Sequence, residues 1–293
     1  MTHIKTSPMS KFYRVLLVFV MCFAAVITLY PMIYVLSMSL SAPEHVIRRD
    51  VYFLPKGFTL SGYRTLLANP FVWSAYYNTI WYTVVGTLVN LVLTVCAAYV
   101  LSRRNFVFRR FFSLMITFTM FFGGGLIPFF IIVANLGLYN TRWAMIFPFA
   151  VSAWNIIIAR SFYETISESI VEAAKIDGAN DISILYLIMV PLSGPIIAVI
   201  ALFSAVGYWN TYFWPLVLLP NPSLQPLQIY LYQILIQLRE DLIGGLQIGI
   251  NRAMQAEQLK FSGIMITVLP FLFICPFLQR YFVKGVMIGS IKE

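Results

Sequence analysis

The sequence predicts an all-α, polytopic membrane protein with six transmembrane helices, and both its composition and the placement of its charges support this fold class. Apolar residues make up 60% of the 293 positions, charged residues only 11%, and the mean hydropathy is +0.83. Soluble domains carry about 25% charged residues, so this composition excludes an ordinary soluble fold. Asp, Glu, Lys and Arg are also absent from six long runs: 15–43, 65–102, 111–141, 143–159, 182–238 and 261–279.

A bilayer core of about 30 Å needs about 20 mostly apolar helical residues, and this length divides the uncharged runs into spans. In chain order we expect spans at 15–38, 73–101, 111–134, 143–163, 191–218 and 261–283. The first span has a basic lead-in but is too long for a signal peptide, so we expect a retained anchor. Gly123-Gly124-Gly125 interrupts the third span, which leaves close helix packing and a hinge as the two interpretations. The run 228–238 is only about half as long as a crossing requires, so we expect a surface or re-entrant helix there.

Basic residues predict how the chain is oriented. Four arginines crowd the short 102–110 loop, and lysines and arginines flank both ends of the chain. By the positive-inside rule these three places are cytoplasmic. The net charge of +9 therefore indicates membrane topology and not nucleic-acid binding, because the positive charges flank spans and form no basic face. We expect a single membrane domain at 15–283, cytoplasmic tails at 1–14 and 284–293, and outer loops at 39–72, 135–142 and 219–260.

Residues 164–190, which we call the acidic segment, lie between the fourth and fifth spans on the expected cytoplasmic side. They hold five of the eleven acidic residues of the chain: Glu164, Glu168, Glu172, Asp177 and Asp181. Thr165-x-x-Glu168 and Ser169-x-x-Glu172 are both capping-box patterns, so we expect a helix to begin at one of them. Gly178 predicts the end of that helix, and Asn180 or Asp181 predicts the cap of a second helix that ends before Pro191.

The first of these helices carries a small apolar patch with acidic edges. Helical spacing puts the following residues on one face, with Glu168 and Glu172 beside them: Ile170, Ala173, Ala174 and Asp177. Such a patch suits insertion into a groove of another protein. A helix that only solvates a loop is the alternative, but an anionic inner leaflet attracts basic segments, whereas this one has five carboxylates and one lysine. We therefore favour docking to a partner.

The acidic segment resembles the EAA loop of the inner-membrane permease subunits of ATP-binding-cassette (ABC) importers. The matching residues are Glu172-Ala173-Ala174, Gly178 and Val190-Pro191-Leu192. The stretches 124–148, 208–216 and 276–293 are similar to the subgroup of lipo-oligosaccharide-type and alginate-type oligosaccharide permeases. This resemblance implies the type I importer permease fold and a coupling helix that seats in a cleft of the ATPase subunit. The implied docking residues are Glu172, Ala173, Ala174, Asp177, Gly178 and Ala179.

The resemblance also implies the partners of the chain. They are a second and unlike permease subunit, two ATPase subunits that bind ATP and Mg, and a soluble binding protein that delivers an oligosaccharide, with acidic ones such as alginate fragments preferred. The implied location is the bacterial inner membrane, with membrane lipid around the spans and no nucleic acid. The chain itself is expected to be a non-catalytic subunit without a cofactor or metal of its own.

The residues themselves point to an energy source outside the chain. No G-x-x-x-x-G-K-[ST] sequence is present, so the chain has no P-loop for nucleotide phosphates. Its spans also lack the carboxylates that relay protons in pumps and carriers. An ion-coupled secondary sugar carrier remains the alternative, because backbone carbonyls at broken helices can hold sodium. A membrane-bound enzyme has less support, since the two histidines, His3 and His45, have no evident catalytic companions.

Aromatic and amide side chains in the fourth and fifth spans are candidates for substrate contact, because sugars present both C–H faces and hydroxyl groups. The candidate residues are Asn155, Trp209, Asn210, Tyr212 and Trp214. For the aromatic residues the alternative is a belt at the outer interface, where Trp and Tyr gather. For Asn155 it is a hydrogen bond to another helix.

Overall fold

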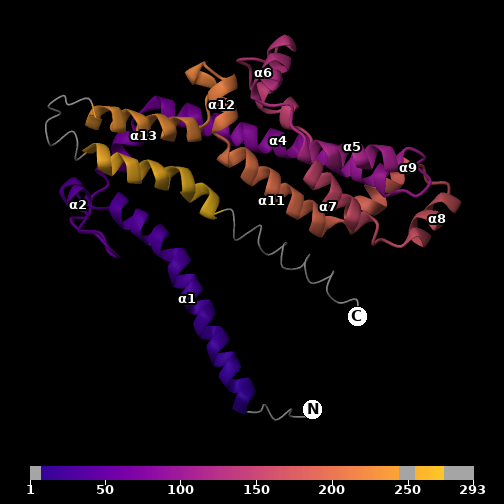
Figure 1. Ribbon diagram of the computed structural model, residues 1–293, viewed down its shortest axis with the longest axis horizontal. Helices are drawn as coiled ribbons and strands as arrows, with labels where there is room; N and C mark the ends of the chain where they lie inside the picture. The colour runs from indigo at the N-terminus through magenta and orange to yellow at the C-terminus, as the bar shows by residue number, and fades with distance from the viewer. Residues whose placement is uncertain (1–7, 244–254, 274–293) are drawn as a thin grey trace. The chain divides into compact units, whose positions relative to one another are not determined.

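A computed structural model describes residues 8–243 and 255–273 (Figure 1). Every regular element in these two ranges is helical, so the all-α fold class is confirmed. The α-helices are α1 (Pro8–Ser39), α2 (Pro43–Arg48), α3 (Ser61–Leu67), α4 (Pro70–Ser102), α5 (Arg109–Phe121), α6 (Leu126–Asn135), α7 (Ala153–Tyr163), α8 (Glu168–Ile176), α9 (Asp181–Ser183), α10 (Val190–Leu192), α11 (Gly194–Asn210), α12 (Phe213–Leu218) and α13 (Leu227–Ile243), with a further helix at Gln255–Phe273. Short 3₁₀-helices are η1 (Arg142–Met145), η2 (Phe147–Phe149) and η4 (Pro222–Leu224), and η3 (Ile184–Met189) is a π-helix.

By length and composition, the described helices can supply up to six spans, in agreement with the prediction. Three are single helices, at Phe12–Ser39, Pro70–Ser102 and Gln255–Phe273. The other three are bent pairs: α5 with α6 at 117°, η1 and η2 with α7 at 46°, and the α9–α10 stretch with α11 at 83°. The last part of the predicted sixth span, 274–283, lies outside the described residues.

The third predicted span is broken where its glycines lie. α5 ends at Phe121 and α6 begins at Leu126, and between them Gly125 has φ +82°, a left-handed conformation that costs glycine nothing. A Cβ on Gly123 or Gly124 would meet no atom within 4 Å. Close packing against these glycines, one of the two interpretations, is therefore wrong within the described part of the chain. Their use is to turn the backbone through 117°.

The fifth span is shorter than the sequence predicts. We expected it at 191–218, but α11 runs from Gly194 to Asn210, and Thr211 has an extended backbone (ψ 126°) that separates it from α12. Pro215, inside α12, lacks the N–H that a continuous helix would need. The helix predicted over 228–238 is present as α13, and its apolar part, Leu227–Ile236, is too short to be a candidate span.

The chain divides into two compact units. Within the described residues, the first combines 8–69 with 233–243 and 255–269, and the second combines 70–232 with 270–273. In the first unit, the amide of Gln258 links the Gln255–Phe273 helix to the chain after α1, since its Nε2 donates to the Ser41 carbonyl at 2.9 Å. Its Oε1 accepts from Ser61 Oγ, also at 2.9 Å, which adds the start of α3.

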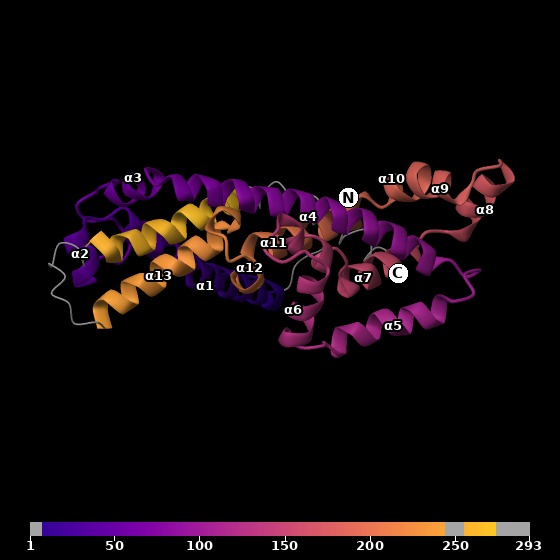
Figure 2. The same cartoon turned by 90° about the horizontal axis from the view of Figure 1, so that it is seen from above.

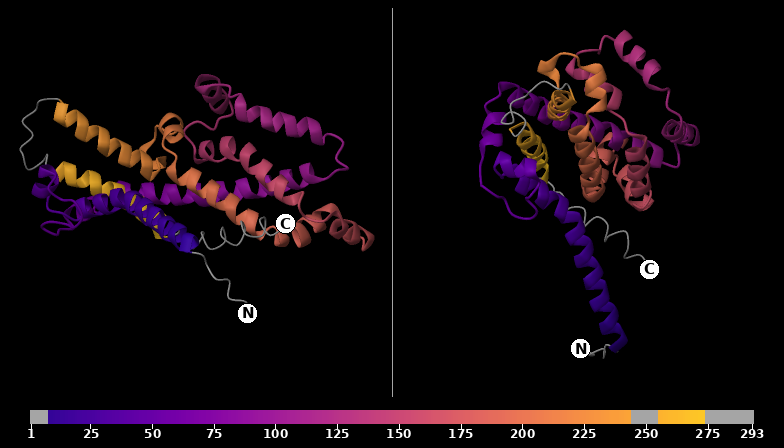
Figure 3. Two further views of the ribbon diagram at one scale, coloured as in Figure 1. Left: turned by 60° about the horizontal axis from the view of Figure 1, so that its bottom comes forward. Right: turned by 60° about the vertical axis from the view of Figure 1, so that its left-hand side comes forward.

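In the second unit, α4 is the central helix. Both α7 and α11 pack along it (Figure 2), and Figure 3 shows the same pairing of α4 and α11 from two other sides. Tyr99, Tyr163 and Ile200, one from each helix, are buried together in one apolar cluster. The acidic segment lies beyond α7, at the end of the unit where α4 finishes (Figure 1).

Candidate functional site

The first helix of the acidic segment is α8, and neither predicted capping box begins it. Ser167 is the N-cap, and its side chain makes no capping hydrogen bond to the backbone. The two predicted caps are used differently: Thr165 Oγ1 donates to the Phe162 carbonyl at 2.7 Å, and Ser169 lies inside the first turn of α8, with its hydroxyl 2.7 Å from that of Ser167. The capping-box prediction is therefore wrong, although α8 starts between its two candidates.

Gly178 ends α8 as predicted. Its φ of +82° is left-handed, and its N–H donates to the Lys175 carbonyl at 3.1 Å. The N–H of Ala179 donates to the Ala174 carbonyl at 2.9 Å. These two bonds form a Schellman motif, which satisfies carbonyls that the end of a helix leaves free. The predicted second cap is also confirmed at Asn180, whose Oδ1 accepts from the Ser183 N–H at 2.8 Å.

The second helix does not stop before Pro191, as the sequence predicted. It continues from α9 through the π-helix η3 into α10 and ends at Leu192. A proline inside an α-helix presses its ring against the carbonyl four residues earlier. The wider turns of η3 lie directly before Pro191, where they change the carbonyl positions, and this is the physical reason that the helix can pass it.

The proposed docking residues divide into an exposed and an inward-facing set. Glu172, Ala173, Asp177 and Gly178 are exposed, whereas Ala174 is buried with Val171 in the apolar cluster between α8 and the main bundle, and Ala179 packs against that cluster. Ile176 on α8 and Ile182 on α9 are 87% and 70% exposed, more than Ile170 of the predicted apolar patch, which is 41% exposed. Sequence reasoning missed these two isoleucines, although both flank the charged turn as large apolar residues.

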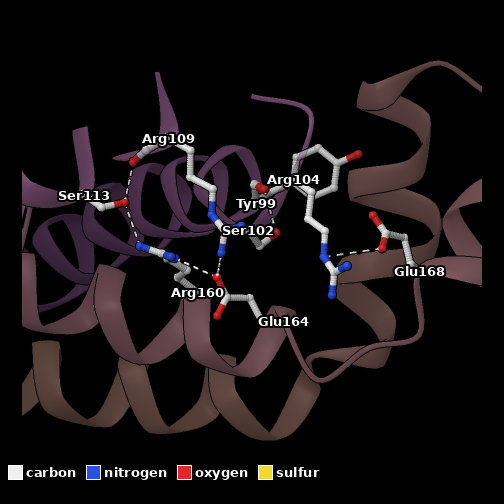
Figure 4. Close-up of polar contacts among 8 residues, drawn as sticks. All are labelled: Tyr99, Ser102, Arg104, Arg109, Ser113, Arg160, Glu164 and Glu168. Atoms are coloured by element: carbon white, nitrogen blue, oxygen red, sulfur yellow. Dashed lines mark hydrogen bonds and ion pairs between the residues drawn. The ribbon is translucent and has the colours of Figure 1, made fainter. Parts of the chain in front are cut away.

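Ion pairs connect the acidic segment to the loop between α4 and α5 (Figure 4). Arg104 Nε lies 3.6 Å from Glu168 Oε2, at the first residue of α8. Glu164 Oε1 accepts from Arg109 Nη2 and, at 2.8 Å, from Arg160 Nε. Arg160 Nη1 also donates to Ser113 Oγ at 2.6 Å. The Glu164 carboxylate and this hydrogen bond therefore both join α5 to α7.

The Glu164 carboxylate is held in its charged form. Partial burial raises its pKa, but the hydrogen bonds and charges of Arg160 and Arg109 outweigh this effect and leave the pKa below its ordinary value. The ion pairs of Glu164 with Arg109 and Arg160 are therefore formed at neutral pH. Two arginines that the sequence assigned to membrane topology, Arg104 and Arg109, thus also fix the position of the acidic segment.

A second candidate site is a buried polar knot, formed by Asn90, Asn155 and Ser204 from α4, α7 and α11. Asn155 Nδ2 lies 3.1 Å from Asn90 Oδ1 and 3.1 Å from Ser204 Oγ, and Ser204 Oγ donates to Asn90 Oδ1 at 2.8 Å. Asn90 Nδ2 donates to the Ala150 carbonyl at 3.0 Å. Asn155 therefore forms hydrogen bonds to other helices, which is the role that the sequence left open as the alternative to substrate contact.

An open pocket of about 260 Å³ lies against this knot. Its lining residues are Asn90, Met145, Phe149, Ser152, Asn155, Phe203, Ser204, Gly207, Tyr208 and Thr211. Of the five predicted substrate-path residues, Asn155 lines it and the other four lie elsewhere. Trp209 is buried, Trp214 packs with its ring centroid 4.4 Å from that of Phe129, and Asn210 and Tyr212 are exposed.

We expect Asn155→Ala to lower the free energy of unfolding by about 1–2 kcal/mol, since it removes two interhelical hydrogen bonds that are worth about 0.6 kcal/mol each on average in membrane proteins and leaves buried partners. Thermal or denaturant unfolding of the detergent-solubilised chain measures this loss of unfolding free energy. Asn210→Ala is the matched control, because Asn210 is exposed and its Nδ2 donates to the carbonyl of Val206 in its own helix, at 3.1 Å. Equal stabilities of the two variants would contradict the knot.

This chain is similar in sequence to a known protein family and to known proteins. Residues 90–288 match the family model of the binding-protein-dependent transport system inner membrane component. The chain is 37% identical to the polygalacturonan/rhamnogalacturonan transport system permease protein YtcP of Bacillus subtilis, over 92% of this chain and 94% of that protein. It is 38% identical to the protein LplC of the same species, over 91% of this chain and 90% of LplC.

A solved structure is also similar. It belongs to a bacterial ABC transporter involved in the import of the acidic polysaccharide alginate, and it superposes with a TM-score of 0.85 and 36% sequence identity, over 96% of this chain and all of the other. A shared fold and a shared family model agree with the motif at Glu172–Gly178. The chain therefore belongs to the family of binding-protein-dependent transport system inner membrane components, as a permease subunit of the ABC importer type.

Proposed function

We propose that this chain is the permease subunit of an ATP-driven importer for acidic oligosaccharides. The observation that carries the proposal is the construction of the acidic segment, which presents Glu172, Ala173 and Ile176 outward on α8 while Val171 and Ala174 anchor that helix to the bundle. An outward face with a rigid base can receive a force from a partner and pass it to the spans. The permease fold supplies the path across the membrane.

The partners follow from this assignment. Two ATPase subunits bind ATP and Mg and dock against the acidic segment, a second and unlike permease subunit completes the path, and a soluble binding protein delivers the sugar. Closure of the ATPase pair moves α8 and opens the path outward, and release of the hydrolysis products reverses it. The chain lies in the bacterial inner membrane, with both termini and the acidic segment on the cytoplasmic side.

The substrate class is inferred from relatives. YtcP is described as a transport system permease for polygalacturonan and rhamnogalacturonan, and the structural relative belongs to an importer of the acidic polysaccharide alginate. The pocket beside Asn155 offers amides and hydroxyls next to aromatic faces, a combination that suits sugar hydroxyls and C–H surfaces. Acidic oligosaccharides are therefore the proposed class.

The test is ATP hydrolysis by the importer reconstituted with its co-purified partner subunits and binding protein. We expect oligogalacturonate or alginate fragments to raise the hydrolysis rate several-fold above the basal rate, whereas neutral malto-oligosaccharides of equal length leave it unchanged. Stimulation by the neutral sugars alone would overturn the acidic class. Uptake without ATPase subunits would overturn the importer mechanism.

A further inference from the structure

Arg103, directly after α4, is a partly buried cation for which the described residues provide no anionic partner within ion-pair distance. Its guanidinium carbon lies 4.6 Å from the ring centroid of Tyr99, and its Nη2 donates to Met189 Sδ at 3.7 Å. A thioether is a weak acceptor. The Nε is buried with no hydrogen-bond partner. A guanidinium withdrawn from water in this way is unfavourable unless an anion reaches it.

A polar pocket of about 360 Å³ lies beside this guanidinium. Arg103, Arg104, Arg109, Glu164 and Glu168 supply its charged walls. The Nε of Arg109 is also buried there without a partner. Three guanidiniums and two carboxylates therefore line the pocket, and the site retains a positive charge. The pocket is therefore built for an anion with several acceptor oxygens.

The position of the pocket selects the kind of anion. It lies where α4 ends and α5 begins, which is the level at which predicted spans meet water. The loop beside it and the start of α5 expose large apolar side chains, with Val107 at 86%, Phe108 at 60% and Phe111 at 62%. Aromatic residues beside basic ones are typical of the headgroup level of a bilayer. An anion that arrives with acyl chains can contact both sets of side chains at once.

We propose that this pocket binds the phosphodiester headgroup of an anionic phospholipid, with Arg103 as the central ligand and Arg104 and Arg109 beside it. Guanidiniums recognise phosphate oxygens through several parallel hydrogen bonds, and basic pockets at the cytoplasmic ends of spans suit such headgroups. The phosphodiester of the bound lipid supplies the negative partner that the described residues do not provide for Arg103. Lipid binding at this pocket requires only that the chain is embedded in a membrane, and it does not depend on the transported sugar.

The experiment measures lipid binding to the purified full-length chain. Phosphatidylglycerol is titrated in mixed micelles against phosphatidylcholine with the same acyl chains, and bound lipid is counted by native mass spectrometry. Arg103→Gln is expected to weaken phosphatidylglycerol binding about fivefold, from about 1 kcal/mol per basic residue near an anionic surface. Arg110→Gln is the matched control, since it removes the same charge from the nearby first turn of α5 and Arg110 is not among the residues that line the pocket.

Arg104→Gln provides a second variant whose folding is not in question, because the Arg104 side chain is 79% exposed. It lines the pocket and is expected to weaken binding as well. Equal losses in Arg103→Gln, Arg104→Gln and Arg110→Gln would show diffuse surface charge and overturn the site. If inorganic phosphate at millimolar concentration displaces phosphatidylglycerol completely, the pocket is a free-phosphate site and the lipid assignment fails.

Discussion

Gly178→Val is expected to uncouple ATP hydrolysis from uptake in the reconstituted importer while the chain still inserts into the membrane. Gly178 has φ +82°, and a left-handed conformation costs a residue with a side chain about 1–2 kcal/mol, most for β-branched residues. That cost opposes the Schellman motif and shifts the population of the intact turn by about 5–30-fold. Binding-protein-stimulated ATPase activity and sugar uptake, measured on the same proteoliposomes, report the loss.

The cause is conformational strain and not lost space, since a Cβ on Gly178 would meet no atom within 4 Å. Gly178→Asn separates the two causes, because asparagine adopts the left-handed conformation more readily than other residues with side chains. It should retain most of the coupled activity. If Asn and Val are equally inactive, the surface at this position matters to the partner by itself, and the turn geometry does not explain the loss.

The sequence alone was sufficient for the parts of the fold that depend on local chemistry. Long uncharged runs predicted the spans, and Gly178 and Asn180 predicted the turn between α8 and α9, because a left-handed residue and an amide cap act within four residues. The start of α8 was missed, because the local sequence there offers more than one candidate cap. Thr165, Ser167 and Ser169 can each serve as a cap, so the local sequence does not distinguish the candidate starts.

The breaks inside spans were harder to predict. Gly123–Gly125 could either pack or turn, and its sequence is the same in both cases. Membership of the binding-protein-dependent family decides against the ion-coupled carrier that these broken helices left open. The polar knot also depends on three helices that are distant in sequence, so Asn155 could be nominated by its polarity, but Asn90 and Ser204 could not be paired with it.

The contact between Gly86 of α4 and the ring of Tyr208 of α11 predicts the second large effect. Gly86→Ala is expected to lower the free energy of unfolding by about 1–3 kcal/mol, because the new Cβ would lie 2.4–2.6 Å from three ring atoms of Tyr208. The ring cannot rotate away freely, since its hydroxyl donates to the Phe149 carbonyl at 3.1 Å. The two helices must then separate. Alanine favours a helix by about 1 kcal/mol over glycine, and the clash has to exceed this gain.

Gly207→Ala is the control that isolates the clash. Gly207 precedes Tyr208 in α11, and a Cβ there would meet no atom within 4 Å, so the helix preference acts alone and the variant should unfold no more easily than the unchanged chain. The loss of unfolding free energy in the Gly86→Ala, Tyr208→Ala double variant should be smaller than the sum of the two single losses. Without the Tyr208 ring, the new Cβ at position 86 has no clash to relieve. Strict additivity in thermal unfolding would mean that α4 and α11 do not meet at Gly86 and that the packing of the second unit is different.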